Sequence, residues 1–303
     1  IRESRVIRGK YILTAEDIIA LKRFEDVVAV AGYPVDIHHA SGGDCTMIYC
    51  DDSYDIPYRV LVPEKIGGLL VAGRSSSMNH EAMAATRVMS TCMALGQAAG
   101  TAAAMIIEKD TTPAGLRKDH IAELQDALED DDCMLPYRWR KVAPLTLAAK
   151  TLAENEPMRN GIDREWNGED NGVYTAPGEV NLTYTWAKPV TVSDARFIFD
   201  SDLKVRSKRM RKLEATTERK EMPSEMVKAF KVQVRVPAAT RKQSKLNAAD
   251  PAAGEWVTVA EVKDNFRRLV KLSFDAVQTD AVRIVVDETW GAEKAHIFAF
   301  DVK

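Results

Sequence analysis

Residues 69–105 read LLVAGRSSSMNHEAMAATRVMSTCMALGQAAGTAAAM, and this stretch indicates an α/β arrangement. The apolar residues 69–72 predict a short strand that ends at Gly73, where the missing side chain lets the backbone approach a ligand closely. A serine-rich polar loop follows, and the alanine-rich run from Arg87 to Ala104 predicts a helix. This order of strand, glycine, loop and helix is typical of a ligand-binding edge in an α/β domain.

The predicted helix has two features that suit a nucleotide-type site. Its first N–H groups have no partner inside the helix, so they favour a phosphate or the electron-rich carbonyl edge of a reduced flavin. Gly96 and Gly100 lie on one helix face, where small side chains let another element pack closely. Ordinary packing would give the same pattern, and the chain has no GxGxxG motif opening a βαβ unit. The residues alone leave both interpretations open.

Further segments extend this pattern in a fixed order: RESR at 2–5 with YILT at 11–14, GYPVDIH at 32–38, YDIPYR at 54–59, LLVAGR at 69–74, HEA at 80–82 and RVMSTCMALGQAAGTAA at 87–103. Together they resemble the C-terminal portion of a family of FAD-dependent oxidoreductases, which are mostly bacterial flavoproteins of the glutathione-reductase-like fold. The resemblance covers about residues 1–135, and several segments in the right order are more specific than any one of them.

The resemblance implies that this chain carries half of an FAD site. The family's N-terminal Rossmann half, with its phosphate cradle, would lie upstream of Ile1. The chain, which starts without Met, is therefore expected to be an excised or processed fragment. We expect it to be inactive alone and to need an N-terminal FAD-binding segment or chain. The implied cofactor-binding residues are Ala72, Gly73 and Arg74 near the ribityl–phosphate stretch, and Val88, Met89 and Ser90 at the flavin ring.

The resemblance also places His38, His80 and Arg87 near the reactive face of the flavin. A histidine there could accept a proton as substrate is oxidised, because its pKa lies near working pH. Arg87 could bind a carboxylate, a hydroxyl-rich substrate or the flavin carbonyl with its planar donors. The alternatives are a surface role for His38, an ordinary loop role for His80, and a stabilising ion pair of Arg87 with Glu81 or Glu3.

The second half of the chain changes to a β pattern. Alternating runs such as 181–186, 195–199, 230–236 and 281–286 follow one another at short spacing, which predicts an all-β sandwich. Short motifs, among them NGEDN at 167–171 and VSDARFIFDS at 192–201, resemble a discoidin-like, galactose-binding-like jelly roll. The predicted organisation is a partial FAD-dependent oxidoreductase domain of α/β class over 1–108, a helical connector over 109–150 and a β-sandwich over 151–303.

Carbohydrate is a candidate ligand of this sandwich, although fold resemblance alone does not establish sugar binding. Such a site would use exposed aromatic side chains at one end of the sandwich. Trp166 and Trp290 lie beside turn-rich segments, so we expect them to be more exposed than Tyr174, Trp186 and Trp256.

Composition excludes several classes of function. A net charge of −3 gives no general bias toward nucleic acid, and the basic run 204–221 lacks interleaved aromatic residues, which favours a solvated loop. The four cysteines show neither CxxC nor metal-ligand spacing, so we expect no metal site and no disulfide-reductase mechanism. The apolar run 88–107 is expected to be a tightly packed helix of a soluble protein rather than a membrane span. The sequence leaves a cytoplasmic, a periplasmic and an exported location open.

Three functional hypotheses follow. The first is an enzyme portion whose parent transfers hydride between the flavin and a small organic substrate, with carbohydrate derivatives as one option. The second is a carbohydrate-binding module. The third is a chain that completes an FAD site together with a separate N-terminal partner.

Overall fold

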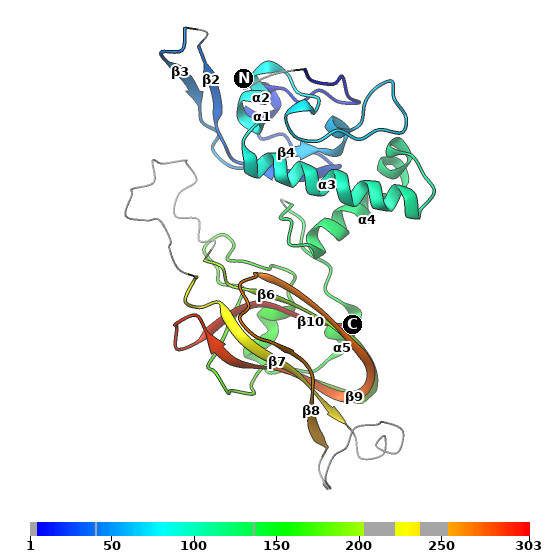
Figure 1. The fold of residues 1–303 in the computed structure, drawn as a ribbon, viewed down its shortest axis with the longest axis vertical. Helices are drawn as coiled ribbons and strands as arrows, with labels where there is room; N and C mark the ends of the chain where they lie inside the picture. The colour runs from blue at the N-terminus through cyan, green and yellow to red at the C-terminus, as the bar shows by residue number, and fades with distance from the viewer. Residues whose placement is uncertain (1–4, 40, 136, 203–221, 237–253) are drawn as a thin grey trace. The chain divides into compact units, whose positions relative to one another are not determined.

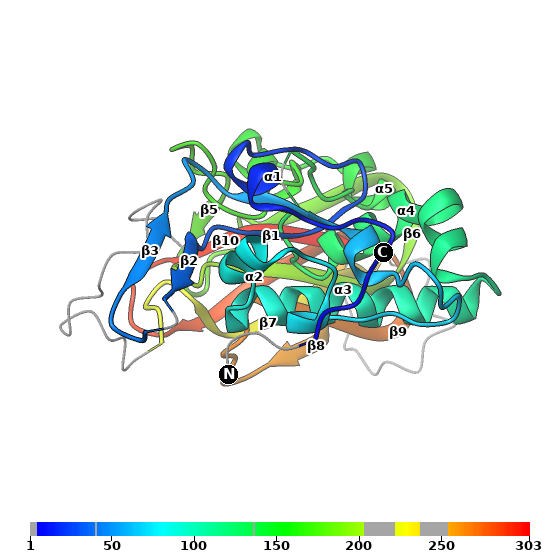
Figure 2. The same ribbon diagram turned by 90° about the horizontal axis from the view of Figure 1, so that it is seen from above.

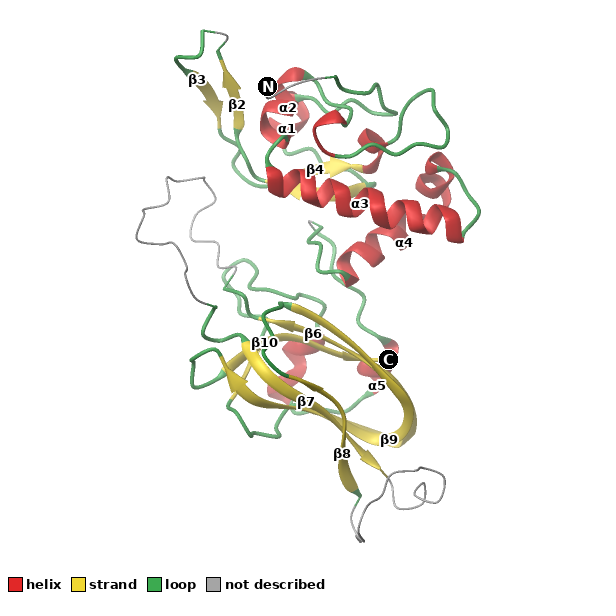
Figure 3. Cartoon of the chain, viewed as in Figure 1, coloured by secondary structure: helices red, strands yellow, loops and turns green. Residues whose placement is uncertain are grey.

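The structure, a computed structural model, describes residues 5–39, 41–135, 137–202, 222–236 and 254–303. The chain divides between Trp139 and Arg140 into two compact units (Figure 1). Residues up to Trp139 are the N-terminal unit, and those from Arg140 are the C-terminal unit. The N-terminal unit carries the long helices and the C-terminal unit the large sheet (Figure 3). The basic run 204–221 lies outside the described residues.

The N-terminal unit is built from short strands and packed helices. Strands β1 and β4 pair in antiparallel fashion, α3 packs on β1, and α4 packs on α3. The hairpin of β2 and β3 lies at one edge of the unit (Figures 1 and 2). The elements are α1 (Ala15–Ile19), β1 (Val27–Ala31), β2 (Val35–His38), β3 (Cys45–Ile48), β4 (Tyr54–Pro57), η1 (Tyr58–Leu61), η2 (Gly73–Ser75), α2 (His80–Thr86), α3 (Met89–Glu108) and α4 (Pro113–Asp130).

The helix starts of this unit differ in how their N–H groups are satisfied. Thr14, Asn79 and Thr112 accept hydrogen bonds from the first turns of α1, α2 and α4. Helix α3 begins after Val88, whose apolar side chain provides no such cap. The first N–H groups of the longest of these helices therefore remain available to another acceptor.

The strand predicted at residues 69–72 is wrong. These residues belong to no assigned strand, although Ala72 is extended and the Val71 N–H donates to the Leu61 carbonyl at 2.9 Å. An apolar run becomes a strand only where a second strand pairs with it, and among the described residues this is the only backbone–backbone hydrogen bond to residues 69–72.

Helix α3 is buried on one side only. Thr91, Leu95, Ala98 and Ala102 face the core, whereas Met89 is 83% exposed and Met93 is 69% exposed. Of this helix, which was expected to be tightly packed, only one face is buried among the described residues. Among the described residues, α3 is long and apolar enough to cross a membrane by length and composition, which is weak evidence because core helices pass the same test.

The C-terminal unit is a six-stranded antiparallel sheet in the order β5-β10-β6-β9-β7-β8, which curls around an apolar core (Figure 1). The predicted strands 181–186 and 195–199 merge into one long strand, β6, and the predicted strand 281–286 lies within another, β9. The pairing of β6 with β9 is interrupted at residues 185–190 and 192–194. These interruptions let one strand bend and serve both layers of a sandwich. The elements are α5 (Pro144–Ala148), η3 (Ala153–Arg159), β5 (Val173–Thr175), β6 (Thr183–Phe199), β7 (Val227–Val236), β8 (Glu255–Val262), β9 (Leu269–Thr289) and β10 (Ala295–Val302).

A buried network of charges ties the start of this unit to its sheet. Asp163 accepts from Arg140 Nε at 2.8 Å and from Arg196 Nη1 at 3.0 Å, and Arg140 also pairs with Asp301. All four residues are less than 9% exposed. Burial raises the pKa of the Asp301 carboxyl, while the two arginines oppose that rise.

Candidate functional site

Asp36 in β2 gathers three polar side chains at the edge of the N-terminal unit. Its Oδ2 accepts hydrogen bonds from Tyr33 Oη and from Arg87 Nη2, both at 3.0 Å. His38 Nε2 lies 3.1 Å from the same oxygen. The structure therefore brings two of the predicted catalytic residues, His38 and Arg87, onto one carboxylate.

Opposing effects determine the charge of Asp36. Burial raises the pKa of this carboxyl, but the hydrogen bond from Tyr33 and the proximity of His38 and Arg87 outweigh burial. The net effect lowers the pKa, so Asp36 is ionised at neutral pH. Burial, reinforced by the neighbouring Asp36, raises the pKa of the Tyr33 hydroxyl, which therefore stays a donor.

Asp36 and Tyr33 were not among the residues predicted for the site. One sequence signal was available, because Asp36 and His38 are two residues apart in a strand and so share a face. The contact of Arg87 with Asp36 spans 51 residues and follows from no local pattern. Helix α2 makes this contact because it packs on β2 and ends at Arg87.

The predicted cofactor-binding residues meet at the start of α3. Gly73 adopts the left-handed backbone conformation, with φ of +70°, and the position of its missing Cβ lies 3.9 Å from Cys92 Cβ and Sγ. The Cys92 thiol, in the first turn of α3, lies 3.6 Å from the Arg87 carbonyl oxygen. Gly73, Arg87 and the first turn of α3 are thus neighbours, although 14 residues separate the first two in the sequence.

The surfaces of these residues suit a ligand. Met89 and Ser90 are exposed at the uncapped start of α3, Arg74 is exposed beside Gly73, and Ala72 and Val88 are half-buried. Burial raises the pKa of the Cys92 thiol, with the charge of Arg74 opposing it. Cys92 therefore stays a neutral thiol and is no reactive thiolate.

The structure does not bring His80 into this group. His80 is the first residue of α2 and Arg87 directly follows its last, so about two helical turns, roughly 10 Å, separate them along the axis. His80 is exposed at the helix start. Tyr54 and Tyr58 of the YDIPYR segment are fully buried in the core.

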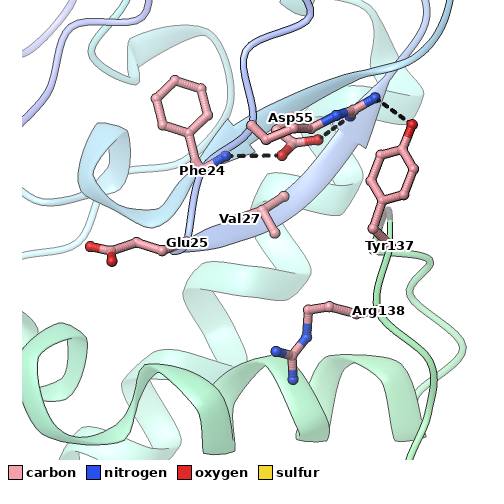
Figure 4. A pocket seen from close by; sticks show the side chains of 7 residues that line it. Phe24, Glu25, Val27, Asp55, Tyr137 and Arg138 are labelled. Carbon is pink, nitrogen blue, oxygen red and sulfur yellow. Dashed lines mark hydrogen bonds and ion pairs between the residues drawn. The ribbon is translucent and has the colours of Figure 1, made fainter.

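A cavity of about 400 Å³ lies elsewhere in the unit, between β1 and the segment at Tyr137 (Figure 4). Its charged side chains already have ion-pair partners. Arg23 Nη1 binds Asp55 Oδ1 at 2.6 Å and its Nη2 donates to Tyr137 Oη at 3.1 Å, while Arg138 Nη2 binds Asp126 Oδ1 at 2.9 Å. We interpret this cavity as a packing gap beside the hydrogen bonds that hold residues 137–138 in place. Among the described residues, no group of three or more His, Cys, Asp and Glu side chains could hold a metal ion.

Several solved structures that resemble the chain are carbohydrate-binding modules. The family 32 module of Streptococcus pneumoniae EndoD is 17% identical, with 51% of this chain and 88% of that chain covered and a TM-score of 0.32. A CBM32 module of Clostridium perfringens, in complex with GalNAc-β-1,3-galactose, is 11% identical over 50% and 84%, with a TM-score of 0.30. Chitosan-binding module 1 of Paenibacillus sp. IK-5 is 12% identical over 51% and 91%, with a TM-score of 0.30. At TM-scores this low, the likenesses carry no information about what the C-terminal unit binds.

The N-terminal unit matches a family by sequence. No curated protein matches the chain. The sequence model of the family described as FAD dependent oxidoreductase matches residues 1–128, which end within α4. This match covers the α2–α3 junction and the cluster at Asp36. The N-terminal unit of this chain therefore belongs to the FAD dependent oxidoreductase family, and an antiparallel β-sandwich follows it.

Proposed function

We propose that the N-terminal unit forms the flavin-side half of an FAD site in an enzyme that transfers hydride between FAD and a small organic substrate, with carbohydrate derivatives as the first class to test. One observation carries this proposal. Gly73, the uncapped start of α3 and the group formed by Asp36, His38 and Arg87 lie together within a unit of this family.

The residues at the start of α3 fit the flavin end of FAD. The Met89 and Ser90 N–H groups lie at the positive end of a 20-residue helix, where they would stabilise the electron-rich carbonyl edge of the ring. Gly73 has no side chain to cover this helix start, and its left-handed backbone suits glycine. The side of FAD that carries adenine would need a further surface, which we assign to an N-terminal segment or partner chain.

FAD, when bound, supplies the electron transfer. The chain's own residues would bind and orient the substrate and move its proton. Asp36 holds Nε2 of His38 as a donor, so Nδ1 carries the lone pair and can accept a proton from a substrate hydroxyl. Arg87 uses Nη2 toward Asp36, and its other N–H groups would bind a substrate oxygen.

FAD uptake tests this proposal. We expect the chain to bind FAD weakly by itself and to turn yellow and quench flavin fluorescence when it is mixed with the polypeptide encoded directly upstream of Ile1. Gly73→Val should abolish most of this uptake, because valine disfavours a φ of +70° and its side chain would cover the helix start. Gly68→Val is the matched control, since no atom lies within 4 Å of its added Cβ. A colourless mixture, or equal uptake by both variants, would contradict the proposal.

One observation favours a second function for the C-terminal unit, carbohydrate binding. Tyr174 is 46% exposed, and its ring stacks at 4.2 Å on the buried His296, which holds it flat at the sheet edge. Trp166 and Trp290, which were expected to be the most exposed, are both partly buried. The Trp290 indole N–H also donates to the Asn265 carbonyl at 2.7 Å. A glycan array should therefore give hits that Tyr174→Ala removes and Trp290→Phe retains. An array without hits would eliminate this function.

A further inference from the structure

A second pocket in the N-terminal unit is lined by cations. Its volume is about 320 Å³, and it lies between the segment at Lys10, the start of η1 and the start of α4. Lys10, Arg59 and Arg117 line it together with the apolar residues Val62, Pro113 and Ala114, and no carboxylate side chain is among these lining residues. We propose that this pocket binds the phosphate group of a small molecule.

Two carboxylates outside the lining hold the arginines in place. Asp26, which is fully buried, accepts from Arg59 Nε at 2.8 Å, from Arg59 Nη2 at 3.0 Å and from Arg117 Nε at 3.3 Å. Glu25 Oε1 accepts from Arg117 Nη2 at 2.7 Å. Each arginine is thereby fixed through two of its nitrogen atoms, and within the described ranges no hydrogen bond engages the Nη1 group of either.

Lys10 gives the pocket an excess of positive charge. Its Nζ donates to the Glu64 backbone carbonyl at 3.0 Å, whereas the Glu64 carboxylate pairs with Arg8. The three cations therefore outnumber the two carboxylates, Glu25 and Asp26, that compensate the arginines. An anion entering the pocket would complete the local charge balance.

Helix α4 adds a backbone donor to the same pocket. Of its first three residues, Pro113 has no N–H and Gly115 donates to Thr112 Oγ1 at 3.0 Å. The N–H of Ala114, which lines the pocket, has no partner among the described residues. It lies at the positive end of an 18-residue helix and supports the charge of the side chains.

None of the residues that line this pocket belongs to the flavin-side group, which consists of Gly73, the start of α3, Asp36, His38 and Arg87. Helix α3 has 20 residues and rises by about 30 Å, and the flavin-side group lies at its start. Helix α4 begins at Pro113, just beyond the end of α3 at Glu108. The proposal therefore does not depend on FAD binding and can fail or succeed independently of it.

A phosphate group fits these donors better than a carboxylate. Its three oxygens can accept from the Nη1 groups of two arginines, an ammonium group and an N–H at the same time, whereas a carboxylate offers two oxygens. The volume leaves room for a small organic part beside the phosphate. Inorganic phosphate and phosphomonoesters share this chemistry.

Calorimetric titration of the full chain at constant ionic strength tests the proposal, with inorganic phosphate, glycerol 3-phosphate and acetate as separate titrants. We expect saturable binding of both phosphates and weaker binding of acetate. Tighter binding of glycerol 3-phosphate would identify a phosphomonoester as the ligand, and equal binding would identify free phosphate. Lys10→Gln and Arg117→Gln should each weaken binding about tenfold, because each removes a charge-assisted hydrogen bond.

Lys118→Gln is the matched control, since Lys118 is an exposed cation on the same helix but does not line the pocket. Circular dichroism checks that each variant folds. If Arg117→Gln does not fold, Lys10→Gln still tests the proposal, because Lys10 is exposed and its replacement should leave the fold intact. Phosphate binding that is absent, that Lys10→Gln leaves unchanged, or that Lys118→Gln weakens equally would overturn the proposal.

Discussion

Asp163→Asn should destabilise the C-terminal unit by about 3–5 kcal/mol, the usual cost of leaving buried charges without their partner. Asp163 compensates Arg140 and Arg196, which are 6% and 3% exposed. Asparagine keeps the shape of the side chain but not its charge. Removing one buried negative charge from the network raises the free energy of the native state, whereas the unfolded state, in which all charges are hydrated, changes little.

Urea unfolding followed by tryptophan fluorescence measures this loss. Four of the five tryptophans, all except Trp139, lie in the C-terminal unit, so the signal reports mainly its unfolding. Glu156→Gln is the matched control, because the Glu156 side chain is 53% exposed in its pair with Arg159 and should cost less than about 1 kcal/mol. Equal midpoints for the two variants would show that the buried network contributes little.

Asp36→Asn should slow reduction of bound FAD by substrate about a hundredfold or more in the FAD-loaded enzyme, a typical effect of losing a positioned acid–base group. The substitution removes the ionised oxygen that orients His38 and Arg87 together. His38→Gln should cause a similar loss. Single-turnover stopped-flow measurement of flavin bleaching, with a substrate found by screening small carbohydrates, gives this rate.

His39→Gln is the control for this experiment. His39 follows His38, is exposed and contacts Thr46 Oγ1 at 3.2 Å rather than Asp36, so its loss should leave the rate unchanged. If His39→Gln and His38→Gln slow the reaction equally, the effect belongs to the β2–β3 hairpin and not to proton transfer. Unchanged rates in Asp36→Asn would remove the carboxylate from the mechanism.

The sequence predicted the parts of the fold that depend on local pattern. The alanine-rich stretch from Arg87 gave the long helix α3, and the alternating runs after residue 180 predicted the antiparallel sheet. It failed where a partner distant in the sequence decides the outcome. Residues 69–72 have strand composition but no strand beside them. Strand β6 runs through Pro189, which lies in the interruption of its pairing with β9 between residues 185 and 190.

For the candidate site too, the sequence predicted some residues and missed those whose role depends on partners distant in the sequence. The resemblance led to Gly73 and to the start of α3, which the structure brings together. Asp36 was not predicted as a site residue, because only its contacts identify a buried carboxylate as part of a site. One of these contacts is with Arg87, which lies 51 residues away in the sequence. His80 carried the same sequence signals as Arg87, but helix geometry places the two at opposite ends of α2.

The position of β10 has a consequence for biosynthesis. All eight of its residues are buried, and it lies between β5 and β6 in the sheet. A ribosome making this protein will have released most of the C-terminal unit before residues 295–302 emerge, so the nascent sheet lacks an inner strand until then. During this interval β5 and β6 each expose an unpaired edge, which is the time when chaperone binding or misassociation should be greatest.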